Sequence, residues 1–235
     1  MRPTSNSTRP GGRALRALLL LLLATVGSLA GKAIGSTTSG TNSLSATVVD
    51  NAGQPLEHAV VSLHTAQPAS ADPATIAIMD QRRSQFAPTV VAIQAGTSVS
   101  FPNQDDVRHH VYSFSHPNAF ELKLYHGATG QYHRFEHPGV VVLGCNIHDG
   151  MVGYLRVVDT PHFATSSAEG LLTIDNAPPG NYTLQLWHPD LGMRLIQKPI
   201  TLAAGKFSVR LKLEVADQAP AEPKAAHRLQ SLFRD

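Results

Sequence analysis

The stretch Gly144-Cys145-Asn146-Ile147-His148-Asp149-Gly150-Met151 follows an apolar run, residues 140–143, that reads Val-Val-Val-Leu. A β-branched run that ends in a segment rich in Asn, Asp and Gly is typical of a strand and the loop after it. The loop holds a thiol (Cys145), an imidazole (His148) and a thioether (Met151) close together. Soft sulfur ligands combined with imidazole favour copper. The stretch therefore predicts a strand whose end carries three candidate copper ligands.

Similar short β-rich runs lie on both sides of this loop. Turn residues separate them, as in Asp50-Asn51-Ala52-Gly53 and Pro178-Pro179-Gly180. The part of the chain from residue 44 to residue 213 has no convincing helical period, so we predict an all-β protein. The expected strands are residues 44–48, 59–63, 89–94, 98–101, 110–114, 140–143, 171–174, 182–187 and 207–213.

A complete copper site needs a second histidine from another part of the chain. Two His and one Cys in a plane around the ion, with a weak axial Met, form the arrangement of electron-transfer copper sites. The segment 101–111 offers two adjacent candidates, His109 and His110. Successive strand residues point to opposite faces, so only one of the two can face the metal. We expect His109 to be the ligand and keep His110 as the alternative.

Residues 1–30 have the features of a secretory signal peptide. Four arginines precede an apolar run with six consecutive leucines at 18–23, and Ser28-Leu29-Ala30 offers the small residues of a cleavage site. The apolar run is too short to span a bilayer comfortably. We expect a cleaved, periplasmic protein without a membrane span, with an uncleaved N-terminal anchor as the alternative.

The net charge and the cysteine content limit the possible functions of the protein further. Removing the four arginines of the leader from the 19 basic residues leaves 15, against 17 acidic residues. No basic stripe with interleaved aromatics remains, so we expect no nucleic-acid partner. Cys145 is the only cysteine. An unpaired thiol in an exported protein invites oxidation unless it is buried or bound to a metal, which favours the metal site.

Histidines are concentrated around the candidate ligands. Seven of the twelve lie within residues 109–148. Four of these have no spacing that defines a shared metal geometry and lie among polar or turn residues, so we expect most of them to be solvated. They are His116, His126, His133 and His137.

Residues 78–158 resemble the cupredoxin family, which includes plastocyanin and amicyanin. The matching positions are Phe86, Pro88, Gly96, Val99, Phe101, Asn103, His109, Phe135, Pro138, Gly139, Cys145, His148, Met151 and Gly153. The resemblance implies a Greek-key β-sandwich with one type 1 copper ion bound by His109, Cys145, His148 and Met151. The short gap between His148 and Met151 is more similar to amicyanin than to plastocyanin.

Two positions depart from the plastocyanin pattern. His110 stands where the family often has an Asn that braces the cysteine loop, which puts the support of the ligands in doubt. Gly144 stands where the family often has a Tyr that is proposed as an electron route. We therefore expect electrons to use the exposed edge of His148.

The flanking sequence resembles a carboxypeptidase regulatory-like, transthyretin-type β-sandwich. The resemblance is carried by Val48-Val49-Asp50, Glu169-Gly170-Leu171 and Pro179-Gly180-Asn181-Tyr182. It implies a discontinuous module made of residues 42–65 and 165–213, into which the cupredoxin segment 78–158 is inserted. Bacterial proteins described as methylamine utilization or plastocyanin-like proteins have a similar layout. Residues 216–235 are rich in Ala, Pro and charge and are expected to form a mobile tail.

These observations predict a blue copper protein that carries single electrons between redox partners, such as a cytochrome and a dehydrogenase. Copper binding and delivery with the same ligands is the alternative. A structural or adhesion module with a decayed metal site is a third possibility. We do not expect an enzyme, because the sequence shows no paired carboxylates and no base placed beside a nucleophile.

Overall fold

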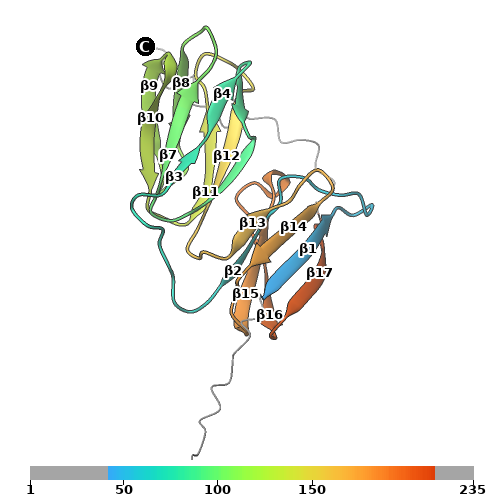
Figure 1. Cartoon of the computed structure of the whole chain (residues 1–235). Coiled ribbons are helices and arrows are strands. Elements are labelled where there is room, and N and C mark those ends of the chain that lie inside the picture. Colours follow the sequence, from blue (N-terminus) through green and yellow to red (C-terminus); the bar gives the residue numbers. More distant parts are fainter. Residues whose placement is uncertain (1–41, 215–235) are drawn as a thin grey trace, which may run out of the picture. The chain divides into compact units, whose positions relative to one another are not determined.

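The structure is a computed structural model of the chain, and it describes residues 42–214. The predicted signal peptide, 1–30, and the predicted tail, 216–235, lie outside the described residues. Within them the regular elements are β-strands and one short 3-10 helix, η1 (Pro189–Leu191) (Figure 1). The prediction of an all-β protein is confirmed. No helix in the described part of the chain is long and apolar enough to cross a membrane.

Strand pairing groups the first two strands with the last five. A three-stranded sheet has the order β14-β1-β17, in which β1 is antiparallel to β14 and parallel to β17. A four-stranded sheet has the order β13-β2-β15-β16. The bounds are β1 (Ser43–Val49), β2 (Val60–His64), β13 (Phe163–Thr165), β14 (Leu171–Asp175), β15 (Gly180–Trp187), β16 (Ile196–Leu202) and β17 (Lys206–Lys212).

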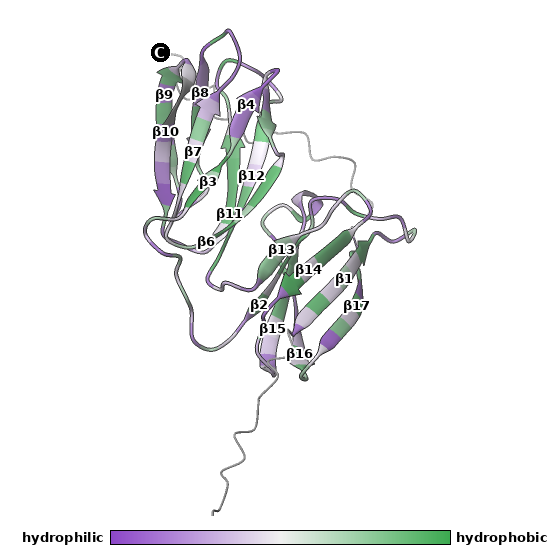
Figure 2. Ribbon diagram, in the orientation of Figure 1, coloured by the Kyte–Doolittle hydropathy of each residue, from purple (hydrophilic) through white to green (hydrophobic). Residues whose placement is uncertain are grey.

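Alternating side chains turn these two sheets into a sandwich. On β1, Leu44, Ala46 and Val48 are buried, whereas Ser45 and Thr47 lie on the outer face, which gives the alternating colours of that strand in Figure 2. This is the period of two expected for a strand with one buried face. The shared core takes side chains from both sheets. It includes Leu44, Val61, Leu63, Leu172, Ile174, Leu184, Leu186, Trp187 and Leu211.

The ten strands between them form a second pair of sheets. One has the order β10-β7-β4-β5, with β3 also paired to β7, and the other has the order β6-β12-β11-β8-β9. The bounds are β3 (Ile76–Ile78), β4 (Asp80–Arg82), β5 (Gln85–Ala87), β6 (Val90–Gln94), β7 (Thr97–Asn103), β8 (His109–Ser113), β9 (Phe120–Tyr125), β10 (Gly127–Phe135), β11 (Gly139–Gly144) and β12 (Val152–Val158).

The core of this second sandwich determines where the candidate ligands lie. Phe101 and Phe135 from one sheet pack in the same buried cluster as Val111 and Leu155 from the other. Cys145 and Met151 belong to that cluster as well. The loop between β11 and β12 is therefore anchored in the core at both ends. The predicted ranges 42–65 with 165–213 and 78–158 stay predictions, although the strand pairing divides the chain in the same order.

Six strands of this sandwich were not among those expected: the short strands β3, β4 and β5, and the longer strands β9, β10 and β12. In β9, β10 and β12, Gly, His or charged residues within the strand interrupt the apolar pattern. β10 forms because it pairs with β7 from Gln131 to Phe135, so tertiary pairing overrides the weak local preference. β12 combines antiparallel pairing with β11 and parallel pairing with β6.

Candidate metal centre

His109, Cys145 and His148 come together at one end of the second sandwich. His109 begins β8, and Cys145 follows directly after β11. The two strands are antiparallel, so the start of one lies beside the end of the other. The Sγ atom of Cys145 lies 3.7 Å from Nδ1 of His109 and 3.7 Å from Nδ1 of His148. Among the described residues these three form the one group of His, Cys, Asp and Glu side chains close enough to hold a metal ion.

The spacing of these atoms fits a shared metal ion. A metal bonded to sulfur at about 2.3 Å and to nitrogen at about 2.0 Å, with about 110–120° between the bonds, separates the two ligand atoms by about 3.5–3.7 Å. Both S–N distances match that value, and the three ligand atoms all lie within 4.8 Å of one another. The ring centroids of His109 and His148 are 4.8 Å apart, and the two ring planes are inclined at 55°. The donor set fits copper.

Burial differs among the predicted ligands. His109 is fully buried, Cys145 and Met151 are buried, and His148 is partly exposed. The amide of Met151 donates to the carbonyl of His148, which closes the loop as a tight turn. Gly150, in the same turn, has a φ of +82° that favours glycine. The thioether of Met151 lies in the same apolar cluster as Cys145.

The structure distinguishes His109 from His110. The ring of His109 faces Cys145, whereas Nε2 of His110 lies 2.8 Å from the carboxylate of Glu121 on β9. The ring of His110 also packs against Tyr112. The two side chains thus leave β8 on opposite faces, as the strand period requires.

Asn103 organises the loop between β7 and β8 that carries His109 to the site. Its buried side chain donates to the carbonyls of Val107 at 2.8 Å and Tyr125 at 3.2 Å. Its carbonyl oxygen accepts the amide of Asp105 at 2.9 Å. One amide therefore ties three backbone groups together. This explains in physical terms why an Asn stands six residues before His109.

Asp105 contacts a candidate ligand, although it was not among the residues predicted for the site. Its Oδ2 atom lies 2.8 Å from Nε2 of His109. Burial by itself would raise the pKa of the Asp105 carboxyl, but hydrogen bonds from the Ser84 amide, His109 and the Arg83 amide outweigh burial. The pKa of Asp105 therefore lies below its usual value, and the carboxylate form is favoured. A carboxylate four residues before the candidate histidine was the available signal.

Tyr112 fills the space above Gly144. The two residues are cross-strand partners, and a Cβ atom on Gly144 would lie 2.9 Å from the end of the Tyr112 ring. Burial raises the pKa of the Tyr112 phenol, and the negative charges of Cys145 and Asp149 add to the effect. Tyr112 also packs against the exposed ring of Phe114. An aromatic side chain therefore lies beside the candidate thiolate even though residue 144 is glycine.

Tyr125 supports the other side of His109, whose backbone partner it is in β9. Its hydroxyl donates to the carbonyl of Phe101 and accepts from the side-chain amide of Gln81. Burial raises the pKa of Tyr125 to about 12, although the hydrogen bond from Gln81 lowers it. The phenol is therefore neutral at physiological pH, and its two hydrogen bonds hold the ring in place.

Three of the four histidines that were expected to be mostly solvated, His116, His126 and His137, are exposed, which agrees with that prediction. His133 lies on β10 and is half-buried, with its ring stacked on Phe120 at 4.4 Å. Burial lowers its pKa. The burial of His133 could not be predicted, because the strand that carries it was not recognised in the sequence.

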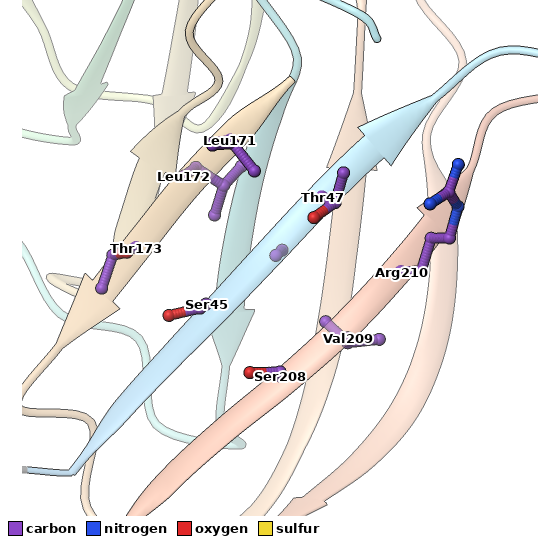
Figure 3. A pocket seen from close by; sticks show the side chains of 9 residues that line it. Ser45, Thr47, Leu171, Leu172, Thr173, Ser208, Val209 and Arg210 are labelled. Carbon is purple, nitrogen blue, oxygen red and sulfur yellow. The ribbon is translucent and has the colours of Figure 1, made fainter. Parts of the chain in front are cut away.

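A separate hollow of about 400 Å³ lies on the outer face of the sheet β14-β1-β17 (Figure 3). Its lining comes from all three strands of that sheet. Hydroxyl groups of Ser45, Thr47, Thr173 and Ser208 and the guanidinium of Arg210 border it. The described lining contains no thiol, imidazole or carboxylate, so this hollow is not a metal centre.

A comparison with solved structures found cupredoxins among the proteins similar to this chain. No protein-family model matches it, and no curated protein matches it in sequence. A purple cupredoxin from Nitrosopumilus maritimus is 24% identical over 35% of this chain and 98% of its own, with a TM-score of 0.31. Amicyanin from Paracoccus versutus is 20% identical over 41% of this chain and 96% of its own, with a TM-score of 0.33.

A third solved structure is the copper-containing nitrite reductase from Thermus scotoductus. It is 24% identical over 48% of this chain and 28% of its own length, with a TM-score of 0.35.

Proposed function

We propose that the protein is a periplasmic type 1 copper protein that carries single electrons between redox partners. In this proposal His109, Cys145 and His148 would hold one copper ion, and the thioether of Met151 would be a weaker fourth ligand. The observation that carries the proposal is the buried thiol of Cys145 with two imidazole Nδ1 atoms, each 3.7 Å away. A bound copper ion would supply reversible one-electron redox chemistry.

The protein supplies a preformed ligand set. His109 is held by the start of β8, and the loop from Cys145 to Met151 is closed by a backbone hydrogen bond and anchored in the core. Ligands that need not move between the two oxidation states favour fast electron transfer, because little reorganisation accompanies the reaction. Burial of His109, Cys145 and Met151 keeps bulk water from the metal, and His148 offers a partly exposed edge through which electrons can pass.

The remaining assignments follow from the sequence. The leader at residues 1–30 supports export to the periplasm, and a cytochrome or a dehydrogenase is the class of partner that exchanges single electrons with such a site. The transthyretin-type module, residues 42–65 and 165–213, would serve rigidity or docking. We also propose that the protein is an electron carrier and not an enzyme.

Electron transfer can be separated from copper delivery by one experiment. The reduced, copper-loaded protein is mixed in a stopped-flow instrument with oxidised cytochrome c, and separately with a metal-free copper acceptor protein. We expect rapid reduction of the cytochrome while the copper stays bound. Transfer of copper to the acceptor faster than electron transfer to the cytochrome would replace the proposal with copper delivery. The variant Cys145→Ser serves as the control for reactions that bypass the site.

A further inference from the structure

The carboxylate of Asp105 contacts the ring nitrogen of His109 that faces away from Cys145. Oδ2 of Asp105 lies 2.8 Å from Nε2 of His109, while Nδ1 of the same ring lies 3.7 Å from the sulfur. His109 is fully buried, so bulk water cannot replace the carboxylate as the hydrogen-bond partner of its ring. An imidazole that donates from one nitrogen presents a lone pair on the other. The contact therefore assigns the proton to Nε2 and leaves Nδ1 free to bind a metal.

The carboxylate is itself held in place from a distant part of the chain. Its Oδ1 atom accepts the amide of Arg83 at 2.5 Å, and its Oδ2 atom accepts the amide of Ser84 at 2.8 Å. These two residues form the turn between β4 and β5, and both have a positive φ, of 52° and 54°. Such conformations cost energy for residues other than glycine and persist only where the surroundings enforce them. The turn thus directs two successive amides at one carboxylate.

A third restraint acts through the backbone of Asp105. Its amide donates to the side chain of the buried Asn103. Hydrogen bonds from backbone amides favour the charged form of a carboxylate, so a full negative charge is kept one imidazole ring away from the metal position. The neighbouring Asp106 is exposed, and it carries the same charge without this connection to His109. Asp106 therefore offers a matched comparison.

We propose that Asp105 is a positioning residue that fixes the orientation and tautomer of His109 and lowers the reduction potential of the metal centre. This inference rests on the proposed function. The charge stabilises Cu(II) relative to Cu(I), because the more positive ion gains more from a nearby carboxylate. A carboxylate partner also makes the imidazole a stronger donor.

The test compares Asp105→Asn with Asp106→Asn in the copper-loaded, full-length mature protein. We expect Asp105→Asn to shift the equilibrium with a common one-electron reductant about tenfold toward Cu(I), equal to a rise of about 59 mV in potential. We also expect it to weaken Cu(II) binding by about 10–100-fold. Asp106→Asn should shift the equilibrium much less, because its charge is solvated and screened.

Equal shifts in reduction potential in the two variants, or no shift in either, would overturn the role of Asp105. The proposed function would still stand in that case if the copper-loaded protein has the intense visible absorption band of a thiolate bound to Cu(II). Absence of that absorption in the unmodified protein would instead reject the proposed function. The tautomer supplies a readout that needs no copper. In the metal-free protein, ¹⁵N chemical shifts of His109 should show a proton on Nε2, and a proton on Nδ1 would contradict the proposal even if Asp105→Asn failed to fold.

Discussion

Nδ1 of His109 lies 3.7 Å from Sγ of Cys145, although 36 residues separate them in the chain. The antiparallel pairing of β8 with β11, in which Tyr112 lies opposite Gly144, brings the start of one strand to the end of the other. The two side chains therefore meet as a consequence of the sheet register and not of a local motif. A metal bound between them would find the site already assembled.

The first prediction concerns the axial ligand. Replacing Met151 with Leu nearly conserves volume, so the cost in stability should stay below about 1.5 kcal/mol. Copper should remain bound because the three ligands in the plane are kept, and the reduction potential should rise because a sulfur donor to Cu(II) is lost. Cyclic voltammetry measures this change. Met79→Leu, at a fully buried methionine of the same core, is the control and should leave the potential nearly unchanged. Complete loss of copper from Met151→Leu would contradict the geometry.

The second prediction concerns Asn103. Asn103→Ala removes the side chain that pairs two carbonyls and one amide of the loop before His109. The unfolding free energy should fall by about 1–3 kcal/mol for a buried group left without a partner, as measured by urea titration. Copper affinity should fall with it because the loop positions His109. Gln104→Ala, at an exposed neighbour, should change neither quantity. A variant at Asn103 as stable as the parent protein would show that water replaces the lost bonds.

The third prediction concerns the contact between Gly144 and Tyr112. An added methyl group at residue 144 would approach the Tyr112 ring to 2.9 Å, closer than nonbonded carbon atoms tolerate. Gly144→Ala should therefore cost about 1 kcal/mol more in the parent protein than in a Tyr112→Ala background. A double-mutant cycle by denaturant unfolding gives this coupling. Gly180→Ala, whose added atom would meet Tyr182 at an ordinary 3.7 Å, should show no such coupling with Tyr112. A coupling near zero would mean that the ring moves freely.

The fourth prediction concerns pH. Burial lowers the pKa of His133 below the usual 6.5, so the folded state keeps the ring neutral where the unfolded state already takes up a proton. The titration of this histidine should have no effect on stability well above pH 6.5, and stability should fall as the pH drops from 6.5 through the lower pKa of the folded state. His133→Gln should reduce that decrease, measured as the difference in unfolding free energy between pH 8 and pH 5. An unchanged difference would show that His133 titrates alike in both states.

Much of the candidate site could be predicted from local sequence because three of its four candidate ligands cluster in one loop. Cys145, His148 and Met151 lie on a segment whose turn residues are evident, and a ligand set missing one histidine restricted the fourth position to residues near 109. Strand alternation indicated that only one of His109 and His110 can face the metal, and the resemblance to cupredoxins favoured His109. These inferences needed no knowledge of distant contacts.

Other features depended on contacts that a sequence does not display. The interaction of Asp105 with His109 requires the turn at Arg83 and Ser84, more than twenty positions earlier, to supply its amides. β10 was not recognised because its Gly and Ala residues are poor strand formers, and pairing with β7 stabilises it. In both cases tertiary structure decided what local preference left open.

The most direct test of the central claim is the visible absorption and EPR spectrum of the mature protein after addition of Cu(II), recorded before and after reduction with ascorbate. The account predicts an intense band near about 600 nm with a narrow copper hyperfine splitting, bleached by the reductant and absent in Cys145→Ser. A weak, broad spectrum, no binding at all, or a blue colour that persists in Cys145→Ser would contradict it.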